Sequence, residues 1–270
     1  MSTARWPQRL AWFGAVLGLL IATLCFAPAR WLASGLAWAS NDKVQIVNTR
    51  GSVWRGQGDL LLTGGEGSRT ESALPQGLRW RLSPTWAERQ PAMALALETP
   101  CCAEQPMQIT LLPSLKGGSL KGGSLRIAAF NSHWPAVLLV GLGTPWNTLR
   151  PEGQLALQSQ GMGVQVAGGR LRLQGTLQVD ALDMTSRLAT LRPLGSYRVV
   201  LRATPEGDSA SLLLQTLSGG LQLTGNGQWL GGRLQFQGVA QAAPGRETAL
   251  ENLLNIIGRR DGPRSILAVG

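Results

Sequence analysis

Hydrophobic and polar residues alternate along most of the chain. Clear examples are the stretches Leu171–Gln174 (LRLQ), Leu221–Thr224 (LQLT) and Leu234–Gln237 (LQFQ). A period of two places apolar side chains on one face of a strand and polar side chains on the other. This pattern is typical of antiparallel sheets with one buried face. The sequence therefore predicts a mainly β protein, with a curved antiparallel sheet shaped like a half-barrel or groove and one continuous apolar face.

Short segments that contain glycine separate these alternating stretches, and we interpret them as hairpin turns. With 35 glycines in 270 residues, the composition also favours short strands and tight turns over a helical bundle. The predicted turns are Gly168–Gly169, Gly175, Gly219–Gly220, Gly225–Gly227 and Gly231–Gly232.

Helical periodicity is sparse, so one or two short helices are expected. Near the C-terminus four apolar residues recur at the spacing of one helix face, namely Leu250, Leu253, Leu254 and Ile257. Gly258 follows as a stop signal, and this helix is predicted to cover the sheet. Residues 259–262 are then predicted to form a turn and residues 265–269 a last strand. A second short helix is expected over residues 133–142.

The N-terminal part of the chain is apolar, and Leu10–Ala29 contains no charged residue. At a rise of about 1.5 Å per residue, a helix of this length just spans the ~30 Å hydrocarbon core of a bilayer. Two arginines precede the stretch and one follows it. The positive-inside rule then predicts that residues 1–9 stay in the cytoplasm, that residues 10–29 span the membrane, and that residues 30–270 lie on the other side.

A cleaved signal peptide is the alternative interpretation of the same segment. The sequence offers small-residue patterns for cleavage at residues 27–29 (APA) and 37–39 (AWA). The apolar region of a signal peptide usually has about 7 to 15 residues, which is shorter than this stretch. A retained anchor is therefore the preferred prediction, and cleavage stays open.

The chain carries a net charge of +10, and most of its basic residues are arginine. These arginines are spread singly along the alternating stretches, as at Arg79, Arg81, Arg198 and Arg202. Nucleic-acid-binding modules usually show basic runs or interleaved stacking aromatics. The pattern favours a solvated outer face, with a general attraction to anionic surfaces such as lipid head groups, and no nucleic-acid partner is predicted.

Candidate catalytic groups are few. His133 is the single histidine, so every Ser-His-Asp, Cys-His or multi-histidine metal scheme would depend on it. Cys101 and Cys102 are adjacent in a predicted loop, where a vicinal disulfide, a disulfide to another chain and two free thiols are all open interpretations. The sequence has no CxxC pair, so a structural zinc site is not expected. We predict a chain that is not an enzyme and has no cofactor and no metal.

Four segments carry a family resemblance: Gly51–Gly56 (GSVWRG), Leu78–Pro84 (LRWRLSP), Pro193–Val199 (PLGSYRV) and Leu253–Gly262 (LLNIIGRRDG). Together with the anchor they resemble protein N of the bacterial type II secretion system, the GspN family. The resemblance implies an accessory inner-membrane component with a periplasmic bulk, which takes part in export of folded proteins from the periplasm to the exterior. It implies protein–protein contacts with the secretin and the inner-membrane platform. The family has no known catalytic residues, so the resemblance implies none in this chain.

The alternating strands are also similar to the β-grooves of AsmA-type envelope proteins. This similarity implies an alternative function, a periplasmic module that binds or transfers lipid, with membrane lipids as partners. The candidate packing or interface residues are Trp54, Trp80, Trp229 and Tyr197, and the tryptophans lie beside predicted strands.

Overall fold

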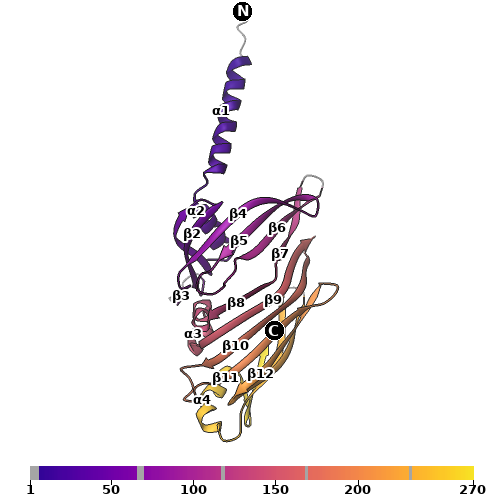
Figure 1. Ribbon diagram of the computed structural model, residues 1–270. Coiled ribbons are helices and arrows are strands. Elements are labelled where there is room, and N and C mark those ends of the chain that lie inside the picture. The colour runs from indigo at the N-terminus through magenta and orange to yellow at the C-terminus, as the bar shows by residue number, and fades with distance from the viewer. Residues whose placement is uncertain (1–5, 66–69, 117–118, 168–169, 231–232) are drawn as a thin grey trace, which may run out of the picture.

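The computed structural model describes residues 6–65, 70–116, 119–167, 170–230 and 233–270 (Figure 1). Within these residues the chain forms one sheet of 16 strands, and all its strand pairs are antiparallel. The N-terminal strands are β1 (Val44–Gly51), β2 (Arg55–Thr63), β3 (Glu71–Ala73), β4 (Leu78–Ala87), β5 (Gln90–Glu98), β6 (Met107–Lys116), β7 (Ser119–Ile127) and β8 (Phe130–Pro135). The C-terminal strands are β9 (Glu152–Ala167), β10 (Arg170–Thr185), β11 (Gly195–Ala203), β12 (Ser209–Gly219), β13 (Leu221–Leu230), β14 (Arg233–Ala242), β15 (Arg259–Asp261) and β16 (Arg264–Val269).

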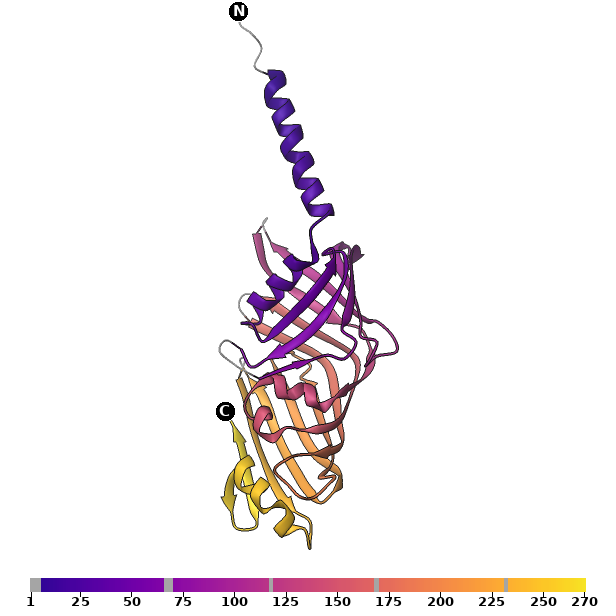
Figure 2. The ribbon, with the colours of Figure 1, turned by 90° about the vertical axis from the view of Figure 1, so that its left-hand side faces the viewer.

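The strands follow one another as a meander, in the order β1-β2-β4-β5-β6-β7-β9-β10-β11-β12-β13-β14-β16-β15. The short strand β3 pairs with β2, and β8 pairs with β9 beyond the end of β7. Figures 1 and 2 show a long, curved, open sheet that runs from the N-terminal strands to the C-terminal ones. The prediction of a mainly β, curved antiparallel sheet is confirmed.

Helices are more numerous than the one or two expected beyond the N-terminal segment. The described residues contain α1 (Trp6–Cys25), α2 (Ala29–Ala39), α3 (Trp146–Leu149), α4 (Glu247–Ile257) and the 3-10 helix η1 (Ala136–Leu142). The predicted second helix over residues 133–142 begins only at Ala136, because His133, Trp134 and Pro135 pair with β9 as part of β8.

The C-terminal prediction holds for the helix and for the last strand. Helix α4 buries Leu250, Leu253 and Leu254, and β16 pairs with β14. The predicted turn at residues 259–262 is right only at Gly262, since Arg259–Asp261 forms strand β15 against β16 and the turn lies at residues 262–263. A hairpin too short to show an alternating pattern explains the error.

The predicted turns were right in one place and wrong in two. Gly219–Gly220 lies at the junction of β12 and β13, but Gly225–Gly227 lies inside β13 and Gly175 inside β10. A Cβ on Gly225 would lie 2.4 Å from the Phe236 ring, so this glycine leaves room for an aromatic side chain on the sheet. Gly175 has a φ of +91° beside a bulge of β9. Gly168–Gly169 and Gly231–Gly232 lie outside the described residues.

The N-terminal segment differs from the single helix predicted over Leu10–Ala29. Helix α1 ends at Cys25 and α2 begins at Ala29, and both Ala27 and Ala29 are buried in the domain. Among the residues with a described structure, no helix has both the length and the hydropathy of a membrane span. Helix α1 projects away from the sheet, and its residues from 11 to 25 are exposed (Figures 1 and 2). Residues 1–5 of the predicted cytoplasmic segment are not described.

Two clusters of buried residues stabilise the two ends of the sheet. The N-terminal cluster joins Ala29 and Ala33 of α2 to Ile46, Leu78 and Trp80 of the strands. The C-terminal cluster joins the leucines of α4 to strands β11, β13 and β14. Helix η1 contributes to both, since Ala136 belongs to the C-terminal cluster and Leu138 to the N-terminal one.

Candidate functional site

The candidate site is the face of the sheet onto which α2, η1 and α4 pack, which we call the inner face. Trp80 lies on this face in β4, and Tyr197 and Leu221 lie on it in β11 and β13, because they belong to the helix-bearing clusters. Directly opposed residues of neighbouring strands share a face, so the strand ladders extend this assignment over the whole sheet. The inner face is the continuous apolar face that the alternation predicted.

Two rows of apolar side chains cross the inner face outside both clusters. In the first row each residue is directly opposite the next, on β5, β6, β7, β9 and β10: Met93, Leu111, Leu125, Val164 and Leu173. In the second row the residues follow the ladders of β10 to β14: Leu177, Leu201, Leu212, Gly227 and Phe236. All ten are partly exposed. We call these two rows the open face.

The inner face carries no charged residue from β4 to β14, over the side chains that the structure describes. Its few hydroxyls are satisfied within the sheet. Ser159 donates to the carbonyl of Thr176, Thr216 to that of Leu223, and Tyr197 to that of Leu221, at 2.8 to 3.1 Å. The face therefore offers apolar contact and almost no free hydrogen-bonding groups.

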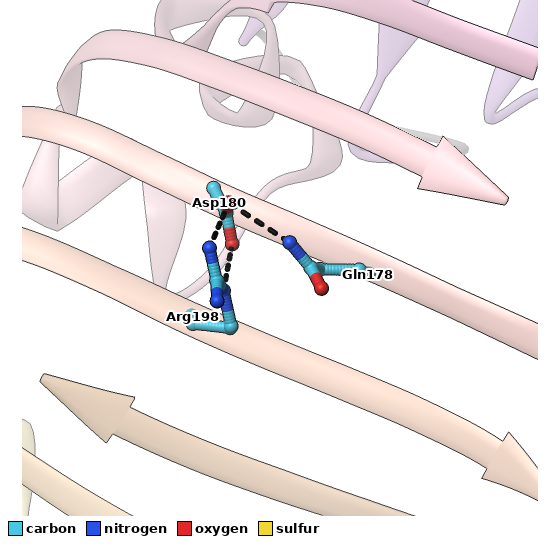
Figure 3. A network of polar contacts seen from close by, with 3 residues as sticks. All are labelled: Gln178, Asp180 and Arg198. Atoms are coloured by element: carbon cyan, nitrogen blue, oxygen red, sulfur yellow. Dashed lines mark hydrogen bonds and ion pairs between the residues drawn. The ribbon is translucent and has the colours of Figure 1, made fainter. Parts of the chain in front are cut away.

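The outer face, by contrast, carries charge. Its best-defined interaction joins Asp180 of β10 to Arg198, the residue directly opposite on β11 (Figure 3). Arg198 donates from Nε to Oδ1 and from a terminal nitrogen to Oδ2, both at 2.7 Å, and Gln178 Nε2 donates to Oδ2 at 3.0 Å. The hydrogen bonds from Arg198 lower the pKa of the Asp180 carboxyl below its ordinary value, although burial opposes this effect.

Replacing Asp180 with asparagine is expected to lower the free energy of unfolding at neutral pH. Because the pKa of Asp180 is lowered in the folded chain, its contribution is present above the unfolded value of about 3.9 and is lost as the pH falls through the folded pKa. The difference in the free energy of unfolding between the variant and the parent chain should therefore become smaller as the pH falls. Urea unfolding at a series of pH values from neutral to strongly acidic measures it.

Asp261→Asn is the matched control for this prediction. Asp261 is exposed in β15, and its carboxylate makes no hydrogen bond or ion pair within the described residues, although its backbone pairs with β16. Its replacement should leave the free energy of unfolding nearly unchanged at every pH. Equal losses in the two variants would show that the ion pair between β10 and β11 contributes nothing.

Trp54 lies between β1 and β2 and holds the end of α1. Its Nε1 donates to the carbonyl of Leu24 at 2.7 Å, and the amide of Val53 donates to the carbonyl of Ala27 at 2.9 Å. These two bonds tie the exposed helix to the first hairpin of the sheet. They could not be inferred from the sequence, since they connect residues about thirty positions apart.

The other candidate packing residues all lie on the inner face. Trp80 is buried, and its Nε1 donates to the carbonyl of Val53 at 3.1 Å. Tyr197 is buried in the C-terminal cluster, and burial raises the pKa of its hydroxyl. Trp229 is partly exposed at the far end of β13, and its buried Nε1 has no hydrogen-bond partner within the described part of the chain.

The structure joins Cys101 and Cys102 by a disulfide in the loop between β5 and β6. The carbonyl of Cys102 accepts a hydrogen bond from the amide of His133 at 2.6 Å, so the loop packs against β8. A cavity of about 640 Å³ beside the disulfide is also lined by Phe130 and Ser159. The vicinal disulfide was one of three interpretations that the sequence left open, and the contact with β8 was not predicted.

Groups for acid–base or metal chemistry are not assembled in the described ranges. The imidazole of His133 is exposed and has no hydrogen-bond partner there. No group of three or more His, Cys, Asp and Glu residues that could hold a metal ion occurs in the parts of the chain with a described structure. The strands and helices instead assemble an apolar surface, the inner face. The alternating sequence pattern predicted this face but could not show which part of it the helices leave uncovered.

Comparison with known protein families matches residues 42–267 to a family described as type II secretion system (T2SS), protein N. No curated protein and no solved structure matches the chain. The matched stretch begins before β1 and ends within β16, so it includes nearly the whole sheet and all four segments on which the sequence resemblance rests. The chain therefore belongs to the type II secretion system protein N family.

Proposed function

We propose that the chain is an accessory component of the type II secretion system that acts through protein–protein contacts and not through catalysis. The match to the family over residues 42–267 carries this proposal. Family membership implies association with other type II secretion components. The absence of an assembled catalytic group among the described residues is consistent with a role in assembly.

In this proposal α1 lies in the inner membrane and the sheet lies in the periplasm. The supporting observation is the exposed apolar surface of α1, where Trp12, Phe13, Leu20 and Leu24 are each exposed by more than half. An uncovered apolar helix on a folded domain is unfavourable in water and favourable in a bilayer. The bonds of Trp54 to Leu24 and of Val53 to Ala27 would then hold the sheet close to the membrane surface.

Strand edges are the surfaces that we propose for contacts with the secretin or the inner-membrane platform. In the strand order of the described residues, β1 and β15 each have one neighbour at an end of the sheet. An unpaired edge presents N–H and C=O groups to which a partner strand can add. At the β15 edge, Arg259, Arg260 and Asp261 are all exposed, so charged side chains are available for a specific contact.

Purification of the intact chain from bacterial membranes tests the proposal. The tagged chain should sediment with the inner membrane, and secretin or platform subunits should be enriched with it after mild solubilisation. Recovery of the chain as a soluble periplasmic protein would show that the N-terminal segment is cleaved. A lack of enriched subunits, together with unchanged secretion on deletion of the gene, would contradict the assembly role.

A further inference from the structure

A role in protein contacts at the strand edges does not explain the open face. Its two rows cross nine strands, from Met93 on β5 to Phe236 on β14, and each row stays partly exposed. With about 4.8 Å between neighbouring strands, eight intervals give a length of about 38 Å. Apolar surface of this extent is uncommon on the outside of a monomeric domain, and it indicates a binding surface.

We propose that the open face binds the acyl chains of membrane phospholipids. Each leaflet of a bilayer has a hydrocarbon layer of about 15 Å, which is half of the ~30 Å core. An extended acyl chain is therefore shorter than the open face and can lie along it. Such a chain has no hydrogen-bonding group, which matches a surface whose backbone is paired in the ladders and whose rows carry only apolar side chains and Gly227.

A peptide is a poorer fit to this surface. An extended peptide would bring N–H and C=O groups into contact with a face that offers them no partner, and an unpaired buried polar group is costly. Protein interfaces usually contain about one hydrogen bond per 100–200 Å², and the open face has no charged side chain to supply them. The chemistry of the face thus favours hydrocarbon over a protein partner.

Glycines beside the second row make room for the ring of Phe236. A Cβ on Gly225 would lie 2.4 Å from the ring of Phe236, and one on Gly238 would lie 3.1 Å from it. The ring therefore lies flat against the sheet, over positions that have no side chain of their own. A partly exposed aromatic ring that lies against the sheet provides a broad apolar contact for a chain of methylene groups.

The position of α1 explains where the lipid would come from. Helix α1 leaves the molecule at the end of the sheet that holds β1, β2 and β4, so the first row lies nearer to it than the second (Figures 1 and 2). If α1 sits in the inner membrane, the open face leads from the membrane surface toward β14. The supply of lipid thus rests on the proposed insertion of α1, but the acyl-chain site itself does not.

Photo-crosslinking of the full chain in its native membrane tests this inference. A benzophenone amino acid is placed at Leu212 on the open face or at Ser211, which is exposed on the outer face of the same strand. Mass spectrometry of the purified chain should find phospholipid adducts at position 212 and none at position 211. Adducts with a protein or with a second copy of the chain at position 212, equal lipid adducts at both positions, or no adduct at position 212 would overturn the proposal.

Phospholipid retention by purified variants gives a second, independent measurement. Leu201→Asp places a carboxylate on the open face and should reduce the phospholipid bound per chain by about tenfold, because burial of an unpaired charge against hydrocarbon is strongly unfavourable. Arg202→Asp, on the exposed outer face of the same strand, should leave retention unchanged. Equal retention in the two variants would contradict the site. If Leu201→Asp does not fold, the crosslinking result decides alone. Neither measurement depends on whether secretion subunits co-purify.

Discussion

Replacement of Trp80 with alanine is expected to lower the free energy of unfolding by about 3–5 kcal/mol. Trp80 is only 2% exposed and packs in the N-terminal cluster with Leu78 and the alanines of α2. Its ring lies against Gly56, where an added Cβ would come within 2.4 Å of it. The substitution would leave a cavity and would also remove the partner of the Val53 carbonyl.

Trp86→Ala is the matched control, because Trp86 lies on the same strand but is 75% exposed. It should change the free energy of unfolding by less than about 0.5 kcal/mol. Urea unfolding followed by near-ultraviolet circular dichroism, with the full chain in detergent, compares the two variants. Similar losses for both would mean that the N-terminal cluster does not stabilise the sheet.

Replacement of Leu254 with alanine should have the second large effect, a loss of about 2–5 kcal/mol. Leu254 is 1% exposed and packs with Leu250 and Leu253 between α4 and the strands. Its carbonyl accepts a hydrogen bond from Ser265 of β16, so the helix is fixed to the last strand of the sheet by packing and by polar contact. The substitution should therefore also destabilise the C-terminal strands against which α4 packs.

Ile256→Ala provides the control on the same helix, since Ile256 is 48% exposed. This variant should remain within about 1 kcal/mol of the parent chain in urea unfolding, because little apolar surface is lost. Hydrogen exchange of β14 and β16 gives a more local measurement: Leu254→Ala should speed the exchange of their amides, and Ile256→Ala should not. Unchanged exchange in both variants would contradict the packing of α4 on these strands.

The fold could be predicted where the residue pattern reports burial directly. Alternation identified the one-faced sheet, and the spacing of Leu250, Leu253 and Leu254 identified α4, because each pattern follows from the period of its element. The second helix of the N-terminal segment was missed, since α2 lacks charged residues other than Arg30 and continues the apolar composition of α1.

Glycine was the main source of error in the strands. A glycine can allow a turn, a bulge or the close approach of a side chain, and the sequence does not distinguish these uses. Gly219–Gly220 allows a turn, Gly175 lies at a bulge, and Gly225 allows the close approach of the Phe236 ring. The identity of the open face depends on cross-strand register and on where the helices pack, and neither is encoded within a single strand.

The proposed contact of this chain with other secretion subunits is tested most directly at the β15 edge. A photoreactive residue at Arg260 lies at the end of the sheet, whereas one at Arg202 lies on β11 with β10 and β12 on either side. In intact cells we expect adducts with a secretin or platform subunit at position 260 and none at position 202. If position 260 gives no adduct with any secretion subunit, or if both positions give the same adducts, the proposed edge contact is contradicted.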